Sequence, residues 1–196
     1  MIRRLEGDIM SLEDLRKEID EIDKNIKELF VKRMHVVEKI SDYKAETGDE
    51  IYKPEREAEM LKKCSRGMDA SVKEEYVSLV RKIVMLSREH QYKRLFSKGY
   101  LKDVSVSGYQ PNHNRLGVSF NCNDECGSLT FVLSIISDYG VNIKNLNLTN
   151  ITENGLIAYR VELLMDMGVD SEKEKALITQ LMKETDDFKI LGTYKI

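Results

Sequence analysis

The feature that most constrains the fold is an apolar repeat that runs through residues 12–40 without a glycine or proline. Its members recur at alternating spacings of three and four residues: Leu12, Leu15, Ile19, Ile22, Ile26, Leu29, Arg33, Val36 and Ile40. This heptad seam predicts one long helix that packs its apolar stripe against another helix. Ser11, followed by Asp14, predicts the start of this helix as a variant of the capping box.

One member of the seam is a cation. Arg33 stands where the pattern asks for Leu or Ile, and the structural alternative is a residue that snorkels or pairs with a glutamate. Lys44 lies eleven residues further on, about three turns at roughly 3.6 residues per turn, so it projects from nearly the same face. Two cations on one buried face, with no acidic residue between them on that stripe, indicate an anionic ligand.

The polar stretch SDYKAETGDEIYKPERE, residues 41–57, interrupts the helical pattern and predicts a bend. Pro54 suits the first turn of a second helix, and Gly67 its C-cap. Arg56 and Glu57 then stand in the opening turn of that helix, where ordinary surface charge is the structural alternative.

A third helix is predicted from Ser71. One of its faces is formed by Tyr76, Val80, Ile83, Ser87 and Gln91, so the apolar stripe turns polar toward its end. Ser87 and Gln91 are one turn apart and can point at the same ligand, although each alone could be an indifferent polar residue. Together with Arg33 and Lys44 they predict the lining of a pocket.

Composition excludes several kinds of partner. A formal net charge of −3 gives no global reason to expect nucleic acid or an anionic membrane. No apolar run reaches the roughly 20 residues of a membrane span, and MIRRLEGDIM lacks the apolar core of a secretory signal, so we expect a cytoplasmic protein. Cys64, Cys122 and Cys126 lack disulfide spacing, which suits a reducing compartment. Cys122 and Cys126, with His113, supply too few ligands for zinc and no second Cys pair exists, so no metal is expected.

The stretch LRKEIDEIDKNIKELFVKRMHVVEKISDYKAETGDEIYKPERE, followed by SREHQ, resembles the all-helical class of chorismate mutase, as found at the front of bifunctional chorismate mutase/prephenate dehydratases. The resemblance covers residues 12 to about 95. It implies an all-α N-terminal domain of three helices that forms an intertwined dimer and uses no cofactor. One departure from the family is Lys53, where the best-known members have Asp.

The resemblance also implies the active-site residues. The catalytic set is Lys44, Gln91 and Glu57, and the substrate-binding set is Arg16, Arg33, Arg56 and Ser87. Lys44 and Gln91 would face the ether oxygen as chorismate rearranges to prephenate. Arg16 and Arg33 are seventeen residues apart, roughly 25 Å along a helix, so they cannot share a site within one chain. In the family's dimer, Arg16 would serve the partner.

Residues 115–196 predict a second domain. Period-two alternation, a turn at Glu153 to Gly155 and two helical stripes predict an α+β, ferredoxin-like βαββαβ sandwich. The pattern resembles an ACT domain, a small-molecule regulatory module of amino-acid metabolism. The resemblance implies phenylalanine or tyrosine as effector, held by Gly127, Ser128, Leu129 and Asn142. The chain has Asn147-Leu148-Thr149-Asn150 in place of the Glu-Ser-Arg-Pro box of prephenate dehydratases, and a domain that only dimerises is the alternative.

Together these features divide the chain into an N-terminal extension (1–10), a helical chorismate mutase domain (11–96), a linker (97–114) and an ACT-like domain (115–196). The expected function is conversion of chorismate to prephenate in phenylalanine and tyrosine biosynthesis, by a homodimer or higher oligomer under allosteric regulation. Two alternatives are an isochorismate pyruvate lyase and a non-catalytic sensor of aromatic metabolites that acts on a partner enzyme. The joint presence of Lys44, Glu57 and Gln91 argues against the sensor.

Overall fold

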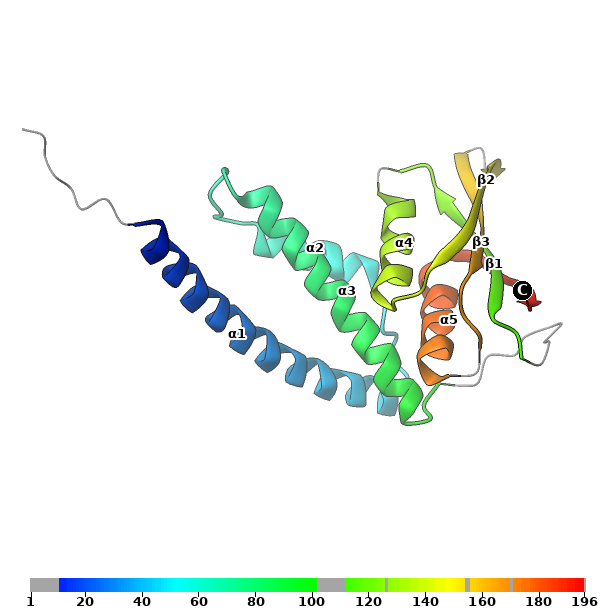
Figure 1. Cartoon of the computed structure of the whole chain (residues 1–196), viewed down its shortest axis with the longest axis horizontal. Helices are drawn as coiled ribbons and strands as arrows, with labels where there is room; N and C mark the ends of the chain where they lie inside the picture. Colours follow the sequence, from blue (N-terminus) through cyan, green and yellow to red (C-terminus); the bar gives the residue numbers. More distant parts are fainter. Residues whose placement is uncertain (1–10, 102–111, 126, 154–155, 170, 196) are drawn as a thin grey trace, which may run out of the picture.

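The computed structural model describes residues 11–101, 112–125, 127–153, 156–169 and 171–195 (Figure 1). Three helices are followed by a β-α-β-β-α-β unit, with bounds α1 Leu12–Thr47, α2 Pro54–Cys64, α3 Lys73–Ser97, β1 Arg115–Asn123, α4 Ser128–Asp138, β2 Ile143–Glu153, β3 Leu156–Met165, α5 Glu172–Glu184 and β4 Asp186–Tyr194. The predicted fold class, an all-α part before a ferredoxin-like βαββαβ unit, is confirmed. The N-terminal extension, most of the linker, Cys126 and the centre of the predicted turn near residue 154 lie outside the described residues.

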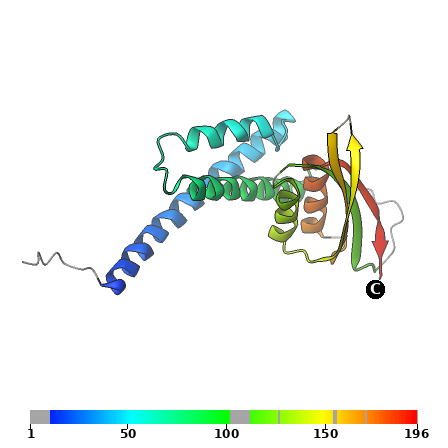
Figure 2. The same cartoon turned by 90° about the horizontal axis from the view of Figure 1, so that it is seen from above.

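Helix α1 begins as its sequence predicts, and it runs on to Thr47, into the stretch that is expected to bend. The Ser11 side chain accepts a hydrogen bond from the Asp14 amide at 3.1 Å, and Gly48 ends the helix in the left-handed region at φ 71°. The apolar seam is exposed over its first half, where its side chains from Leu12 to Leu29 are 45–64% exposed, and its later members Val36 and Ile40 are still 54% and 37% exposed. In both views this half of α1 stands away from the other elements (Figures 1 and 2). Within one chain the seam is therefore not covered as expected, and the buried residues of α1 are Val37, Ser41 and Lys44.

Two helix boundaries differ from the prediction. Helix α2 ends at Cys64 with Ser65 as its C-cap, so Gly67 lies in the following turn and is not the cap. Helix α3 begins at Lys73 and not at Ser71. The reason is an Asx turn, in which one Asp69 carboxylate oxygen accepts from both the amide and the hydroxyl of Ser71 at 2.9 Å.

Helix α3 is buried on two sides in its second half. One side, which carries Ser87 and Gln91, faces α1. The other side packs on α4 and α5, and Met85 and Phe96 belong to the same apolar cluster as the sheet. The helical part and the sheet part of the chain therefore share one core.

The sheet has the strand order β2-β3-β1-β4, and its neighbouring strands are antiparallel. Helices α4 and α5 cover the face that looks toward α3, and the opposite face looks away from the helical part (Figure 2). The covered face carries the fully buried side chains Leu116, Val118, Phe120 and Val161. No helix of the described residues has the length and apolar character needed to cross a membrane.

Candidate active site

Arg33 of α1 meets Ser87 of α3. The Arg33 guanidinium donates to the Ser87 hydroxyl, which itself donates to the Ile83 carbonyl at 2.6 Å. Burial lowers the pKa of Arg33 because the charged form loses contact with water. A neutral hydroxyl does not balance a guanidinium charge. Arg33 is thus a partly buried cation that can accept an anionic ligand.

Gln91 lies one turn after Ser87 and is 6% exposed. Its amide nitrogen donates to the Ser87 carbonyl at 3.1 Å, whereas its amide oxygen is buried and has no hydrogen-bond partner in the described part of the chain. The hydroxyl oxygen of Ser41, a buried residue of α1, likewise has no hydrogen-bond partner in the described part of the chain. Buried polar groups are nearly always paired, so these atoms mark a place where a ligand can bind.

Lys44 is a buried cation in the last turn of α1. Its ammonium donates to the Ile51 carbonyl at 2.9 Å. Burial lowers the pKa of Lys44, Asp49 opposes this shift, and the nearby charge of Arg56 adds to it. Lys53, the departure from the family pattern, pairs with Asp49 at 2.5 Å.

Glu57 is held by a residue that sequence analysis did not single out. Its carboxylate accepts from Arg88 of α3, and Arg56, which precedes it in the first turn of α2, is exposed. An arginine among the apolar residues Val84, Met85 and Tyr92 was the available signal, of the same kind as Arg33 in its seam.

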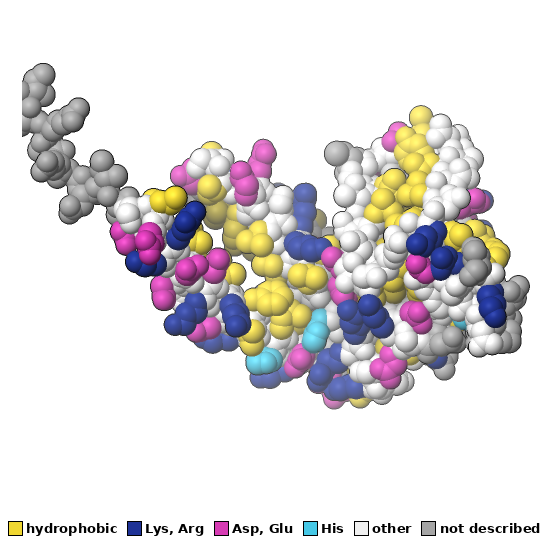
Figure 3. Space-filling view, in the orientation of Figure 1, with side chains coloured by type: hydrophobic (Ala, Val, Ile, Leu, Met, Phe, Trp, Pro, Cys, Tyr) yellow, Lys and Arg dark blue, Asp and Glu magenta, His cyan; other side chains and the backbone are white. Residues whose placement is uncertain are grey.

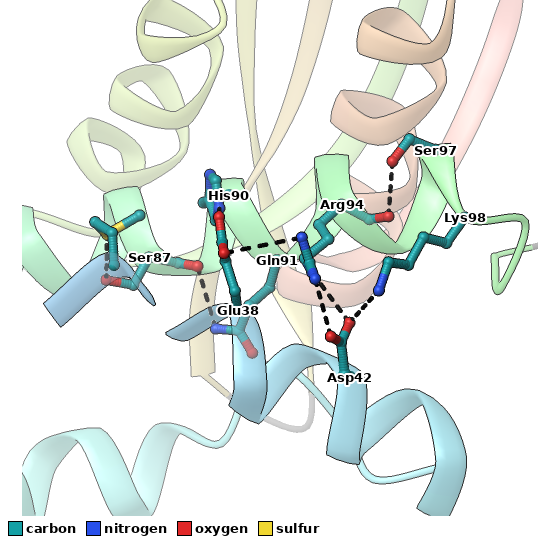
Figure 4. A network of polar contacts seen from close by, with 9 residues as sticks. Glu38, Asp42, Ser87, His90, Gln91, Arg94, Ser97 and Lys98 are labelled. Atoms are coloured by element: carbon teal, nitrogen blue, oxygen red, sulfur yellow. Dashed lines mark hydrogen bonds and ion pairs between the residues drawn. The ribbon is translucent and has the colours of Figure 1, made fainter. Parts of the chain in front are cut away.

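Ion pairs fix the register between α1 and α3 (Figure 4). Asp42 accepts from Arg94 at 2.9 Å and from Lys98 at 2.6 Å, and His90 lies 3.2 Å from Glu38. The hydrogen bond from Arg94 holds the pKa of Asp42 far below its usual range. With the register fixed in this way, Arg33 stands opposite Ser87 and the end of α1 stands near α2.

Arg16 is the predicted site residue that the chain does not bring to the others. It is exposed, and it lies in the half of α1 that stands apart (Figure 1). Along a continuous helix it lies roughly 25 Å from Arg33. A single chain therefore gathers Arg33, Ser87 and Gln91 with Lys44 nearby, but it leaves Arg16 outside.

Two cavities border these residues, and neither contains the whole set. A cavity of about 240 Å³ is lined by Lys44 together with Ile51 and Tyr92. A larger one of about 920 Å³ lies between α2 and α3 on one side and α4 and β1 on the other, and Glu57 lines it. The space-filling view shows a notch between the helical part and the sheet part (Figure 3). The candidate site is not closed within one chain.

The predicted effector residues lie at the two ends of α4. Gly127, at φ 91°, precedes the helix, with Ser128 and Leu129 in its first turn, and exposed Asn142 follows its far end. A helix of 11 residues is about 16 Å long. These two groups could therefore touch one small ligand only if they came from different copies of the chain.

No cluster of three possible metal ligands of the His, Cys, Asp or Glu type occurs within the described ranges. The thiol of Cys122 is free and buried, and burial raises its pKa. A buried thiol of raised pKa is poorly suited to bind a metal, because the thiolate is the ligand. Cys126 lies outside those ranges.

Comparison with known proteins gives a family match over part of the chain. Residues 15–92 match the family model of chorismate mutase type II. The T-protein of Haemophilus influenzae is 45% identical over 51 residues, which are 26% of this chain and 14% of the relative. The T-protein of Enterobacter agglomerans is 32% identical over 114 residues, 55% of this chain and 30% of the relative. The chain thus spans less than a third of the length of these relatives.

Two solved structures show a distant likeness. One is GqqA, a quorum quenching acylase, with TM-score 0.40 and 18% identity over 47% of this chain and 33% of that one. The other is a prephenate dehydratase in complex with L-Phe from Arthrobacter aurescens, with TM-score 0.39 and 14% identity over 48% and 31% of the two chains. Neither likeness bears on function.

Proposed function

We propose, from the premise that residues 15–92 form a chorismate mutase type II domain, that this protein converts chorismate to prephenate. One observation carries the proposal. Helices α1 and α3 face each other with Arg33, Lys44, Ser87 and Gln91, two desolvated cations and two neutral polar groups. This set suits a dianionic substrate whose reaction needs electrostatic stabilisation and no nucleophile.

The reaction is an intramolecular Claisen rearrangement, in which a carbon–oxygen bond breaks while a carbon–carbon bond forms. The protein accelerates such a step by holding the reactive conformation and by stabilising the charge that grows on the ether oxygen. Arg33 and Ser87 bind carboxylate, since a guanidinium forks onto two oxygens. Lys44 and Gln91 donate to the ether oxygen. Glu57 accepts from the ring hydroxyl.

The remaining two roles fall to Arg56 and Arg16. Arg56, exposed beside the site, adds positive field. This role is supported by the effect of its charge on Lys44, whose pKa it lowers. Arg16 of the partner subunit completes the carboxylate clamp. The exposed seam on the first half of α1 supports such a homodimer, because apolar side chains at heptad spacing are normally covered by another helix.

The purified chain should form prephenate from chorismate and should leave isochorismate unchanged. Both substrates are assayed directly, one by prephenate formation and the other by pyruvate release. Release of pyruvate from isochorismate alone would favour the lyase. Turnover of neither substrate, with binding of aromatic metabolites retained, would favour a sensor.

Free thiols at Cys64 and Cys122 support a reducing compartment such as the cytoplasm.

Replacing Gln91 by glutamate should shift activity toward acid. The amide donates at any ordinary pH, whereas a carboxyl group donates only when it is protonated, a fraction that falls about tenfold for each pH unit above its pKa. The ratio of variant to parent rate constants, measured from pH 4.5 to 8, should therefore fall steadily as the pH rises. A ratio that stays constant with pH would remove Gln91 from the ether oxygen.

An aromatic amino acid, phenylalanine before tyrosine, is the proposed effector. Its carboxylate would meet the free amides after Gly127 of one copy, and its amino group would meet Asn142 of another. Such an effector acts by binding the more and less active states differently, with a coupling free energy of about 1 to 3 kcal/mol. The separation of the two groups along α4 is the support for a site between copies.

Calorimetry on the full chain tests this site. Truncation after Lys98 is unsuitable, because it would expose Met85 and Phe96 of the shared core. Asn142→Ala should abolish the binding heat of phenylalanine. Asn145→Ala, a matched change three residues further on in β2, should retain it. Absence of binding by either amino acid to the parent, or equal binding by both variants, would defeat the regulatory assignment.

A further inference from the structure

Arg88 joins the helical part of the chain to the sheet part through a buried ion cluster. Its side chain is 3% exposed, donates to Glu57 of α2, and lies with its Nε 3.1 Å from a carboxylate oxygen of Glu184 at the end of α5. Its guanidinium also lies over two rings, 4.8 Å from the centre of Tyr52 and 5.2 Å from that of Phe131. Arg88 thus contacts α2, α4 and α5 at once.

The cluster contains one cation and two carboxylates, and the charge state of each depends on the other two. Burial disfavours the Arg88 cation, but Glu184 and Glu57 outweigh this effect and raise its pKa. Burial raises the pKa of Glu184 to about 7, although the Arg88 charge opposes the shift. A buried ion pair whose partner is removed leaves an uncompensated charge, which is strongly unfavourable. Arg88 can therefore keep its place beside Glu57 because the sheet part supplies Glu184.

Glu57 has another cation within electrostatic range. Its charge acts on the buried ammonium of Lys44 and favours the protonated form there. Without Arg88, the Glu57 carboxylate can turn toward Lys44 and weaken the positive field that Lys44 offers to the ether oxygen. The contact with Arg88 leaves one carboxylate oxygen of Glu57 free to accept from a hydroxyl.

We propose that Arg88 is a positioning residue that holds Glu57 toward the substrate hydroxyl, and that Glu184 of the sheet part supports Arg88 in this role. The inference rests on the proposed chorismate mutase function for the meaning of Glu57. It adds that the βαββαβ unit completes the active site of its own chain. Phe131, four residues after Gly127, touches the same guanidinium, so the proposed effector turn and Glu57 share one neighbour.

A double-mutant cycle tests the coupling. Arg88→Met in the full chain should lower kcat by about ten- to a hundredfold, because Glu57 loses its geometry. In a Glu57→Gln background the same change should lower kcat by less than about twofold, because Arg88 acts through a carboxylate that this background already lacks. Equal losses in both backgrounds would overturn the proposal and assign Arg88 a purely structural role.

Stability and activity are separated by a second variant. Arg88→Met/Glu184→Leu replaces the charges of both residues by apolar side chains, a change that is often neutral or stabilising for a buried pair. The variant should unfold near the parent's temperature yet retain the low kcat of Arg88→Met. Parental kcat in this folded variant would contradict the proposal.

Hydrogen exchange supplies a readout that does not depend on turnover. Hydrogen-bonded amides of α2 from Glu57 onward should exchange at least about tenfold faster in Arg88→Met than in the parent, because α2 loses a contact to α3. Lys93→Met is the matched control, since Lys93 pairs with Glu89 and lies over Tyr139 at the same junction without touching Glu57. Faster exchange in Arg88→Met than in the parent, together with a parent that does not turn over chorismate, would sustain the positioning role and reject the proposed function. Exchange in Arg88→Met that equals exchange in the parent, together with a parent that is active, would reject only the positioning role.

Discussion

Replacing Lys44 by methionine is expected to lower the rate constant for chorismate rearrangement by about 10²- to 10³-fold, the usual loss when one preorganised donor to a developing oxyanion is removed. Lys44 is 7% exposed and its ammonium is desolvated, so its charge acts in a medium that screens it weakly. Methionine keeps an unbranched side chain that is one atom shorter, and it removes the charge and the hydrogen bond to the Ile51 carbonyl.

The measurement is single-substrate kinetics on folded protein, with Lys62→Met as the matched control. Lys62 is an exposed lysine in the last turn of α2, and its loss should leave the rate unchanged. The effect of Lys44→Met should fall mainly on kcat, because the interaction strengthens only as charge develops. A kcat near the parent's would place Lys44 away from the ether oxygen.

Much of the helical part could be predicted because its sequence signals are local. Ser11 satisfies a backbone amide at the start of α1, and a period of about 3.6 residues puts Arg33 and Lys44 on one face of it. The same period put Ser87 and Gln91 on one face of α3. The predicted end of α2 at Gly67 and the predicted start of α3 at Ser71 were wrong. Competing local hydrogen bonds, such as the Asx turn at Asp69, decide such boundaries.

Arg88 could not be predicted from the pattern of one helix. An amphipathic stripe indicates a buried face when the opposite face is polar, but α3 is buried on two faces between Val84 and Phe96. Its second face is defined by α5, which lies nearly a hundred residues away in sequence. Pairing with Glu184 is thus a property of the tertiary fold.

The structure of a single chain likewise does not show what covers the apolar seam of α1. The heptad spacing predicts that Leu12 to Leu29 are covered, and the structure of one chain leaves them exposed. The proposed homodimer would cover them with a second copy and would bring Arg16 of the partner subunit to the site. The dimer and the shared active site therefore stand or fall together.

Mixed dimers test this account most directly. Arg16→Ala and Lys44→Met homodimers should each be nearly inactive, because every site lacks one of the two cations. A dimer of one Arg16→Ala chain and one Lys44→Met chain has both defects in one site and neither in the other. Differently tagged variants, refolded together and isolated as mixed dimers, should therefore regain about half of the parental activity. Mixed dimers as inactive as the two homodimers would contradict a chorismate mutase site built from both subunits.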